Sequence, residues 1–367
     1  MRRVVGGAPT GDRCGGAAAH GPAIIEPVRT LSQRELNRAV LARQLLLERA
    51  PTPLPRALER VAGIQAQYAP SMYVGLWSRL QGFERAALTR ALERRSVVQA
   101  TLMRHTIHLV SRADYWPLAL AVREARRAHW LRAMPAAPAP RQMAAAARAL
   151  RGALDGTMTR KEIEALVGKA HMTGVGLWID LVRVPPSGTW ERRRADLYAA
   201  ADDWVGPAPA VDDPAAHLVR RYLAGFGPAA RKDVVSFTGL PPADVHAALE
   251  RLELRRFRSE DGEELLDVPR APLPDPETPA PPRFLPTWDA ILLVHARRTG
   301  VLPEEHRRAI FSSRNPHSFP TFLVDGRVAG TWRHEKGATR LEPFGRLDAA
   351  ARRELRREGD RLAEFHA

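Results

Sequence analysis

A strand pair that follows helical segments recurs three times along this chain of 367 residues, and this order constrains the fold most. The first pair is predicted at 97–110, where the sequence VVQATLMRHTIHLV is β-branched and roughly alternates between apolar and polar side chains. Helical patterns precede it at 56–64, 76–80 and 84–94. Helices followed by a strand pair are the order of a winged-helix unit.

Three helix starts are marked by polar residues at capping positions. Ser32 and Glu35 form a predicted capping box, in which each side chain satisfies a free backbone amide of the first turn. Thr159 and Glu162 repeat this pattern, and Ser111 precedes a further helical segment. We therefore expect helices to begin directly after these residues.

Two more units follow the same plan. The second has a helix after Thr159 and strands predicted at 178–184 and 190–197, on either side of the turn Pro185-Pro186-Ser187-Gly188. The third has the clearest helix–turn–helix spacing, with a tight turn at Asp261-Gly262. Its predicted helices and hairpin are at 218–226, 228–237, 241–252 and 255–268.

Proline-rich and alanine-rich segments at 134–141 and 207–214 read as linkers, and 269–282 reads as an extended connector. Beyond it we expect mostly strand, with apolar runs at 290–295 and 321–324, a hairpin turning at Asp325-Gly326 and a charged helix at 347–365. The expected fold is α+β with three tandem winged-helix motifs. The expected divisions are a disordered segment at 1–28, winged-helix units at 29–133, 141–205 and 215–269, and a β-hairpin and helix region at 283–367.

The chain carries 56 Lys and Arg against 41 Asp and Glu, a formal charge of +15. A G+C-rich genome explains why only four of the basic residues are lysine, but it does not explain the excess of positive over negative charge. Such an excess favours a polyanionic partner, and guanidinium groups match phosphate well. Nucleic acid is the expected partner.

Several chemistries are disfavoured by the residues themselves. The sequence has no Gly-Lys-Thr phosphate loop, no Gly-x-Gly-x-x-Gly, no His-Glu-x-x-His and no Gly-x-Ser-x-Gly. His105 and His108 lie close together, but without a third ligand in register they read as packing residues, so we expect neither metal nor cofactor. Cys14 is the one cysteine, which fits a reducing cytoplasm, and no apolar run resembles a leader or a membrane span.

The tripeptide Gln65-Ala66-Gln67 places two amides around one apolar residue. On a helix they would point about 200° apart, whereas in extended backbone they share one face. Gly63 before and Pro70 after favour the extended form. The two amides then either orient a water and supply dipoles, or are solvent-facing or capping residues without a functional role.

Five segments, taken together and in this order, resemble the AlkZ family of winged-helix DNA glycosylases over about residues 30–360. They are AGIQAQ from Ala62, GLWSR from Gly75, TLMRHTIHLV from Thr101, PSGTW from Pro186 and VDGRVAGTW from Val324. The resemblance implies three winged-helix motifs around a C-shaped, DNA-sized concave face. It also implies excision of N7-alkylguanines, including unhooking of interstrand crosslinks made by an antibiotic such as azinomycin.

The family's catalytic Gln, apolar, Gln motif corresponds to Gln65, Ala66 and Gln67, so the resemblance implies that both glutamines are catalytic. A sister branch has Asp at the last position, and Gln67 places this chain with the crosslink branch. His105 departs from the smaller residue expected there. The chemistry agrees, because N7 alkylation makes guanine a cationic leaving group, and a Gln carbonyl can face the attacking water or the cationic sugar.

The expected function is a monofunctional DNA glycosylase that gives self-resistance to a DNA-alkylating antibiotic. Its partner is double-stranded DNA carrying alkylated or crosslinked guanine, which a monomer binds without a membrane or an obligate protein partner. The alternatives are a winged-helix transcription regulator and a purely structural DNA clamp. The candidate DNA-binding residues are Arg79, Arg104, His108, Arg192, Arg193, Trp332 and Arg333.

Overall fold

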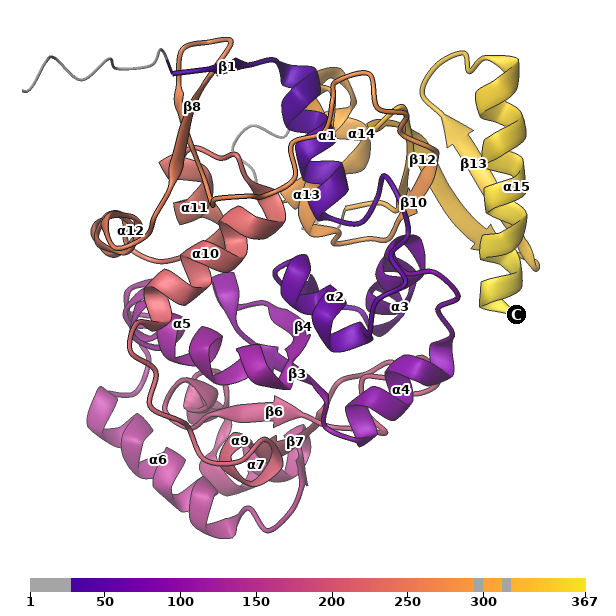
Figure 1. The fold of residues 1–367 in the computed structure, drawn as a ribbon. Helices are drawn as coiled ribbons and strands as arrows, with labels where there is room; N and C mark the ends of the chain where they lie inside the picture. Colours follow the sequence, from indigo (N-terminus) through magenta and orange to yellow (C-terminus); the bar gives the residue numbers. More distant parts are fainter. Residues whose placement is uncertain (1–27, 294–299, 312–317) are drawn as a thin grey trace, which may run out of the picture.

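The computed structural model describes residues 28–293, 300–311 and 318–367 (Figure 1). Except for Val28, the segment 1–28 that was expected to be disordered lies outside the described residues. The described residues form helices and three sheets, which confirms the expected mixture of α and β structure.

The largest sheet joins the first two predicted units. All its strand pairs are antiparallel, in the order β2-β4-β3-β6-β7-β5. The junction lies between β3 and β6, where Gln99 pairs with Arg183 and Ala100 with Val182. The first two units therefore share one continuous sheet. Its strands are β2 (Ile64–Gln65), β3 (Val97–Thr101), β4 (Ile107–Ser111), β5 (Met158–Thr159), β6 (Leu181–Arg183) and β7 (Leu197–Ala200).

The predicted strand pair of the second unit is shorter than expected. β6 and β7 contain only part of 178–184 and 190–197, and residues 184–196 between them form a loop. The buried Ser187 hydroxyl accepts hydrogen bonds from the backbone amides of Asp196 and Leu197 and donates to Arg194 O. These bonds replace the ladder that a longer hairpin would have, so the prediction of two full strands is wrong.

Helices cover this sheet. Three helices of the chain begin directly after the predicted capping residues. Ser32 and Thr159 each complete a capping box, and the Ser111 hydroxyl accepts from Asp114 N. The helices of this region are α2 (Leu54–Arg60), α3 (Ala69–Arg79), α4 (Arg85–Glu93), α5 (Arg112–Ala133), α6 (Pro140–Ala153), α7 (Arg160–Val167), α8 (Lys169–Met172) and α9 (Ala201–Trp204). Short 3-10 turns are η1 (Met103–His105) and η2 (Val175–Leu177).

The third unit has the predicted helix–helix–helix–hairpin order. Gly239, with φ of 70°, ends the second helix in the left-handed conformation. The hairpin is extended by β1, which runs parallel to β8 although it lies at the start of the first predicted unit. The elements are β1 (Thr30–Leu31), α1 (Gln33–Arg43), α10 (Pro214–Phe226), α11 (Arg231–Thr238), α12 (Pro242–Glu250), β8 (Arg255–Ser259) and β9 (Glu264–Asp267).

The C-terminal region is a four-stranded antiparallel sheet covered by a long helix (Figure 1). Asp325 and Gly326 both have positive φ, as the predicted tight hairpin requires. The run at 290–295 was expected to be a strand, but 290–293 form a helix, whose start is stabilised by a hydrogen bond from Ile291 N to the Asp289 carboxylate. Val294 and His295 lie outside the described residues. The elements are β10 (Arg283–Leu285), α13 (Ala290–Leu293), η4 (Glu304–His306), α14 (Arg307–Ile310), β11 (Thr321–Val324), β12 (Arg327–Glu335), β13 (Ala338–Pro343) and α15 (Ala349–His366).

Buried ion pairs connect these regions. Arg43 of α1 makes two hydrogen bonds, of 2.6 and 2.9 Å, to the carboxylate of Asp267 on β9, and both side chains are fully buried. Arg38 of α1 is buried and binds the Asp325 carboxylate at the C-terminal hairpin turn. Since breaking a buried pair leaves an uncompensated charge, these contacts hold α1 against both neighbours.

Candidate active site

Gln65 ends an edge strand of the large sheet, and Gln67 follows two residues later. In β2, Gln65 is opposite His108 of β4, and Ala66 N donates to Ile107 O at 2.7 Å. Ala66 packs into the core, and Gln67 lies in a bend before α3. The tripeptide is therefore not helical, but the β pairing ends before Gln67 and the extended backbone predicted for all three residues is seen only in part.

Gly63 is what allows this strand to start where it does. Its φ of 79° is in the left-handed region, and a Cβ there would meet Val110 Cγ1 at 3.0 Å and Leu109 O at 3.2 Å. A larger residue would be strained by its backbone and crowded by β4. The glycine thus lets the chain turn from α2 directly into the edge strand that carries Gln65.

Gln67 is exposed, and its amide orientation is defined by the backbone. Its Oε1 accepts a hydrogen bond of 2.9 Å from Ile107 N, which settles which end of the amide faces β4. A carbonyl oxygen has two lone pairs, so one remains for a water or a substrate. The exposed Gln67 can therefore orient a solvent molecule without losing its anchor.

Gln65 is buried and faces a cation. Its Oε1 is 3.4 Å from Nη2 of Arg104, whose Nη1 donates to Phe237 O and whose guanidinium lies 5.1 Å from the Phe237 ring centroid. Burial lowers the pKa of Arg104 to about 10. No ion pair of Arg104 with a carboxylate is found among the described residues. Gln65 thus lies beside an uncompensated positive charge.

The loop that supplies Arg104 is held in an unusual conformation. Arg104 and His105 have φ of 52° and 57°, so two consecutive non-glycine residues are in the left-handed region. Such conformations cost free energy and are maintained only where the surroundings enforce them. Gly239 of the third unit supports this loop, because a Cβ there would meet Arg104 N at 3.4 Å.

His108 is a buried neighbour of the glutamine site. It is buried, its Nδ1 lies 3.0 Å from Thr106 O, and burial together with the charge of Arg104 lowers its pKa to about 3. The ring is therefore neutral near pH 7, with Nδ1 as the donor to the carbonyl. The sequence prediction of a DNA contact is corrected to a buried residue opposite Gln65.

Arg79 and Trp332 are also buried, which corrects their assignment as DNA contacts. Arg79 makes two hydrogen bonds of 2.9 Å to the Asp289 carboxylate, and Trp332 Nε1 donates to Leu285 O at 2.9 Å. Arg79 attaches α3 to the C-terminal region, whereas Trp332 joins β12 to β10 within that region. Sequence reasoning could not see this, since the partners are far away in the chain.

The three remaining arginines are exposed but differ in their partners. Arg193 donates to the hydroxyl of Tyr68 at 3.2 Å, and Tyr68, itself exposed, follows Gln67 directly. Arg192 lies 3.9 Å from the carboxylate of Asp196. Arg333 is bound to the carboxylates of Glu335 and Glu342, so its charge is already compensated.

Tyr68 was missed by the sequence reasoning, although an exposed aromatic ring beside a catalytic motif is a usable signal. It links the glutamine strand to the loop at 184–196 through Arg193. The role of Arg104 beside Gln65 was also missed, since the sequence suggested only a phosphate contact. Its left-handed conformation has no clear signature in the residue types.

The described residues contain no group of three or more His, Cys, Asp or Glu side chains placed to hold a metal ion. In that same part of the chain, no helix is long and apolar enough to cross a membrane. The polar groups gathered around Gln65 and Gln67 are amides, a guanidinium and a neutral imidazole.

The site thus has two amides and a buried guanidinium, on a helix-and-sheet fold in a strongly basic chain. A family model described as DNA glycosylase AlkZ-like matches residues 58–365, which is most of the chain. The chain therefore belongs to the AlkZ-like family and is a DNA glycosylase.

The fold is also similar to a solved structure, Streptomyces sahachiroi DNA glycosylase AlkZ, with a TM-score of 0.77. The match covers 92% of this chain and 97% of that chain, at 19% sequence identity. At this identity the likeness shows a shared fold. A search among curated proteins finds no match for this chain.

Proposed function

We propose that this DNA glycosylase hydrolyses the N-glycosidic bond of N7-alkylguanine, removing bulky adducts and unhooking interstrand crosslinks. The observation that carries the proposal is the nature of the site: Gln65 at the end of an edge strand lies beside Arg104, and Gln67 two residues later is exposed. None of these three side chains exchanges a proton readily near pH 7. A site of this kind suits a base that departs without help from a general acid.

N7 alkylation supplies that property, because it gives the guanine a positive charge before the bond breaks. The exposed Gln67 carbonyl then positions the attacking water, and Gln65 presents its carbonyl dipole towards the electron-poor sugar. Arg104 holds Gln65 in place through the 3.4 Å contact with its Oε1. It acts on Gln65 and not on the substrate.

The exposed position of Gln67 and Tyr68 supports the crosslink part of the proposal. A crosslinked guanine is tied to the opposite strand and cannot turn into a closed pocket as a free flipped base does. An exposed glutamine just beyond the end of an edge strand can approach such a lesion from outside. We further propose that the three units are winged-helix motifs around a concave DNA-binding face, and that the activity protects against a DNA-alkylating antibiotic.

The third unit does not support the alternative of a winged-helix transcription regulator. The exposed positions of α12 include Asp244 and Glu250, which repel phosphate, and His246, which is engaged with Arg231. A recognition helix needs side chains that read base edges, such as Asn, Gln or Arg. No such residue lies between Pro242 and Glu250.

The proposal is tested by incubating the protein with duplex DNA that contains N7-methyl-deoxyguanosine and measuring the released base. We expect release well above the spontaneous rate, with unmodified guanine left in place. In a second duplex that carries a bis-alkylated crosslink, base release should unhook the crosslink, so that the two strands separate under denaturing conditions. Release of methylguanine at only the spontaneous rate would contradict the proposal.

A further inference from the structure

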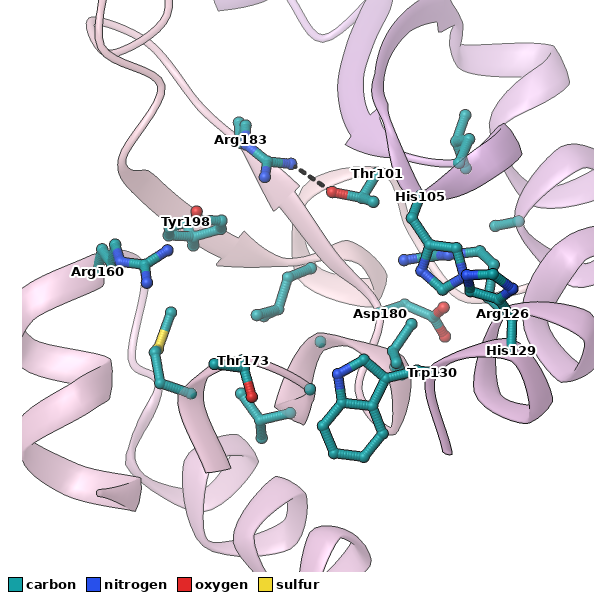
Figure 2. Close-up of a pocket in the computed structure, with 18 of the residues that line it drawn as sticks. Thr101, His105, Arg126, His129, Trp130, Arg160, Thr173, Asp180, Arg183 and Tyr198 are labelled. Atoms are coloured by element: carbon teal, nitrogen blue, oxygen red, sulfur yellow. Dashed lines mark hydrogen bonds between the residues drawn. The ribbon is translucent and has the colours of Figure 1, made fainter. Parts of the chain in front are cut away.

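A second polar site lies on the other side of the β3–β4 loop from Gln65. It is a pocket of about 490 Å³ between the large sheet, α5 and η2, and His105 is part of its wall (Figure 2). Pockets that bind small ligands commonly have volumes of roughly 300–1,000 Å³. None of the roles described above for Gln65, Gln67 or Arg104 uses this pocket.

The wall of the pocket carries more positive than negative charge. Arg126, Arg160 and Arg183 line it, and none of the three has an ion pair with a carboxylate among the described residues. Asp180 is the only acidic residue in the described lining, and its carboxylate is already bound to Arg123 at 2.7 Å. The excess charge is therefore not neutralised from within the site.

Three donors or acceptors in this wall are buried and have no hydrogen-bond partner: Arg126 Nε, Arg183 Nε and His105 Nε2. Leaving such atoms unpaired costs roughly 1–3 kcal/mol each, and more for charged groups. The residues that line this cavity thus already bear an unpaired-atom cost, and a ligand that compensated their charge would offset part of it.

The cations also raise one another's free energy. Burial lowers the pKa of Arg126 to about 10. The charge of Arg183 also lowers this pKa, whereas Tyr115 and Asp180 raise it. Burial and then Arg126 lower the pKa of His105 to about 4. A bound anion would relieve this repulsion, since opposite charge stabilises each guanidinium.

Aromatic rings form another part of the wall. The rings of His105 and His129 have centroids 5.0 Å apart, and Figure 2 shows Arg126 next to them and Trp130 below. Trp130 is packed against backbone, because a Cβ on Gly174 would come within 2.4 Å of its ring. Arg183 and Tyr198 lie on the sheet side, where Arg183 donates to Thr101 Oγ1 at 2.9 Å.

We propose that this pocket binds a nucleotide unit, with the phosphate at Arg126 and Arg183 and the base against His105, His129 and Trp130. Guanidinium groups bind phosphate oxygens through paired hydrogen bonds, and the phosphate would compensate the two charges. A simple phosphate ion would leave most of the 490 Å³ empty, and the rings would have no partner. The nucleotide is either free or part of a DNA strand.

The test measures binding by isothermal titration calorimetry, with no lesion present, so it does not depend on base excision. The probes are deoxyguanosine monophosphate, deoxyguanosine and inorganic phosphate. We expect saturable binding of the monophosphate, and binding at least tenfold weaker for deoxyguanosine. No saturable binding of the monophosphate would overturn the proposal.

Variants locate the site. Arg126→Gln should weaken monophosphate binding at least tenfold, while Arg357→Gln, on the exposed side of α15, should leave it unchanged. Because Arg126→Gln can fail to fold, Thr173→Glu provides a second variant: Thr173 is exposed at the pocket, and a carboxylate there should repel the phosphate. If every variant that folds binds as the wild type does, the pocket is not the binding site.

A competition experiment distinguishes the two sources of the nucleotide. An undamaged single-stranded oligonucleotide is added to protein saturated with deoxyguanosine monophosphate. Displacement of the monophosphate shows that a nucleotide within a strand enters the pocket, and Thr173→Glu should then also weaken binding of the oligonucleotide. If the oligonucleotide binds without displacing the monophosphate, the site serves free nucleotides.

Discussion

The glutamine strand and the C-terminal hairpin contrast in how they use positive charge. At β2, Arg104 lies beside Gln65 with no carboxylate partner among the described residues, and Arg193 donates to the Tyr68 hydroxyl. At the hairpin of β12 and β13, Arg333 is bound to two carboxylates.

The contrast teaches that the available partner decides the role of an arginine in this chain. Where a carboxylate is present, as Asp289 is for Arg79, the arginine joins two regions of the fold. Where none is present, the charge remains available to act on a neighbouring amide or on DNA. The same distinction extends to the hairpin turn, where Asp325 is bound by Arg34 and Arg38.

The largest expected effect is a loss of stability, and it tests whether Arg79 has a structural role. Arg79→Ala leaves Asp289 buried and unpaired, which should lower the free energy of unfolding by about 3–5 kcal/mol. Urea unfolding followed by circular dichroism measures this loss. Arg333→Ala is the exposed control and should change stability by less than about 1 kcal/mol, since exposed pairs contribute little. Equal losses in the two variants would contradict the distinction.

The next effect concerns the catalytic side. Gln65→Ala and Gln67→Ala should each slow base release by about 10²-fold, as loss of one transition-state contact does, and leave duplex affinity near wild type. Gln81→Ala, an exposed glutamine after α3, is the matched control. Wild-type rates in both active-site variants would remove the catalytic assignment. Gln67→Asp should retain activity on methyl adducts.

A smaller effect follows from the neutral state of His108. Burial and Arg104 lower its folded pKa to about 3, below the ordinary value of 6.5, so its contribution to stability is complete above pH 6.5 and is lost as pH falls towards 3. The free energy of unfolding should therefore fall by up to roughly 1.4 kcal/mol per pH unit between pH 6 and 4 on this account. His108→Gln should make this dependence shallower. An unchanged slope in that variant would show that other groups cause it.

The smallest effect sharpens the comparison between exposed arginines. If Arg193 contacts a DNA phosphate, Arg193→Gln should reduce the slope of log affinity against log salt by about 0.9. Arg333→Gln should leave the slope unchanged, because its charge is already compensated. The measurement is fluorescence anisotropy with an undamaged duplex between 50 and 200 mM salt. The reverse pattern would move the DNA-binding face to the C-terminal sheet.

Local signals predicted the elements of this fold well, and long-range partners could not be predicted. Capping residues such as Ser32 and Thr159, and the turn at Asp325-Gly326, act within a few residues and were read correctly. The pairing of β3 with β6 depends on residues more than eighty positions apart, so the continuous sheet was not foreseen. The helix at 290–293 was missed because a short apolar run does not distinguish helix from strand.

The same division holds for the candidate site. The non-helical backbone at Gln65 follows from Gly63 and the short strand after it, which are local features. The burial of Arg79 and Trp332 depends on partners in the C-terminal region, and residue type gave no sign of it. Five ordered motifs identified the family correctly even though several residues within them are structural.

The most direct test of the central claim is the pH dependence of the wild-type rate on N7-methyl-deoxyguanosine, under single-turnover conditions with saturating enzyme. A site that works through amides should show a rate that is flat between about pH 5 and 8.5, because Arg104 has a pKa of about 10 and His108 of about 3. General acid or base catalysis would instead give a sigmoidal or bell-shaped profile. A flat profile, corrected for spontaneous release, supports the account, and a midpoint within that range would contradict it.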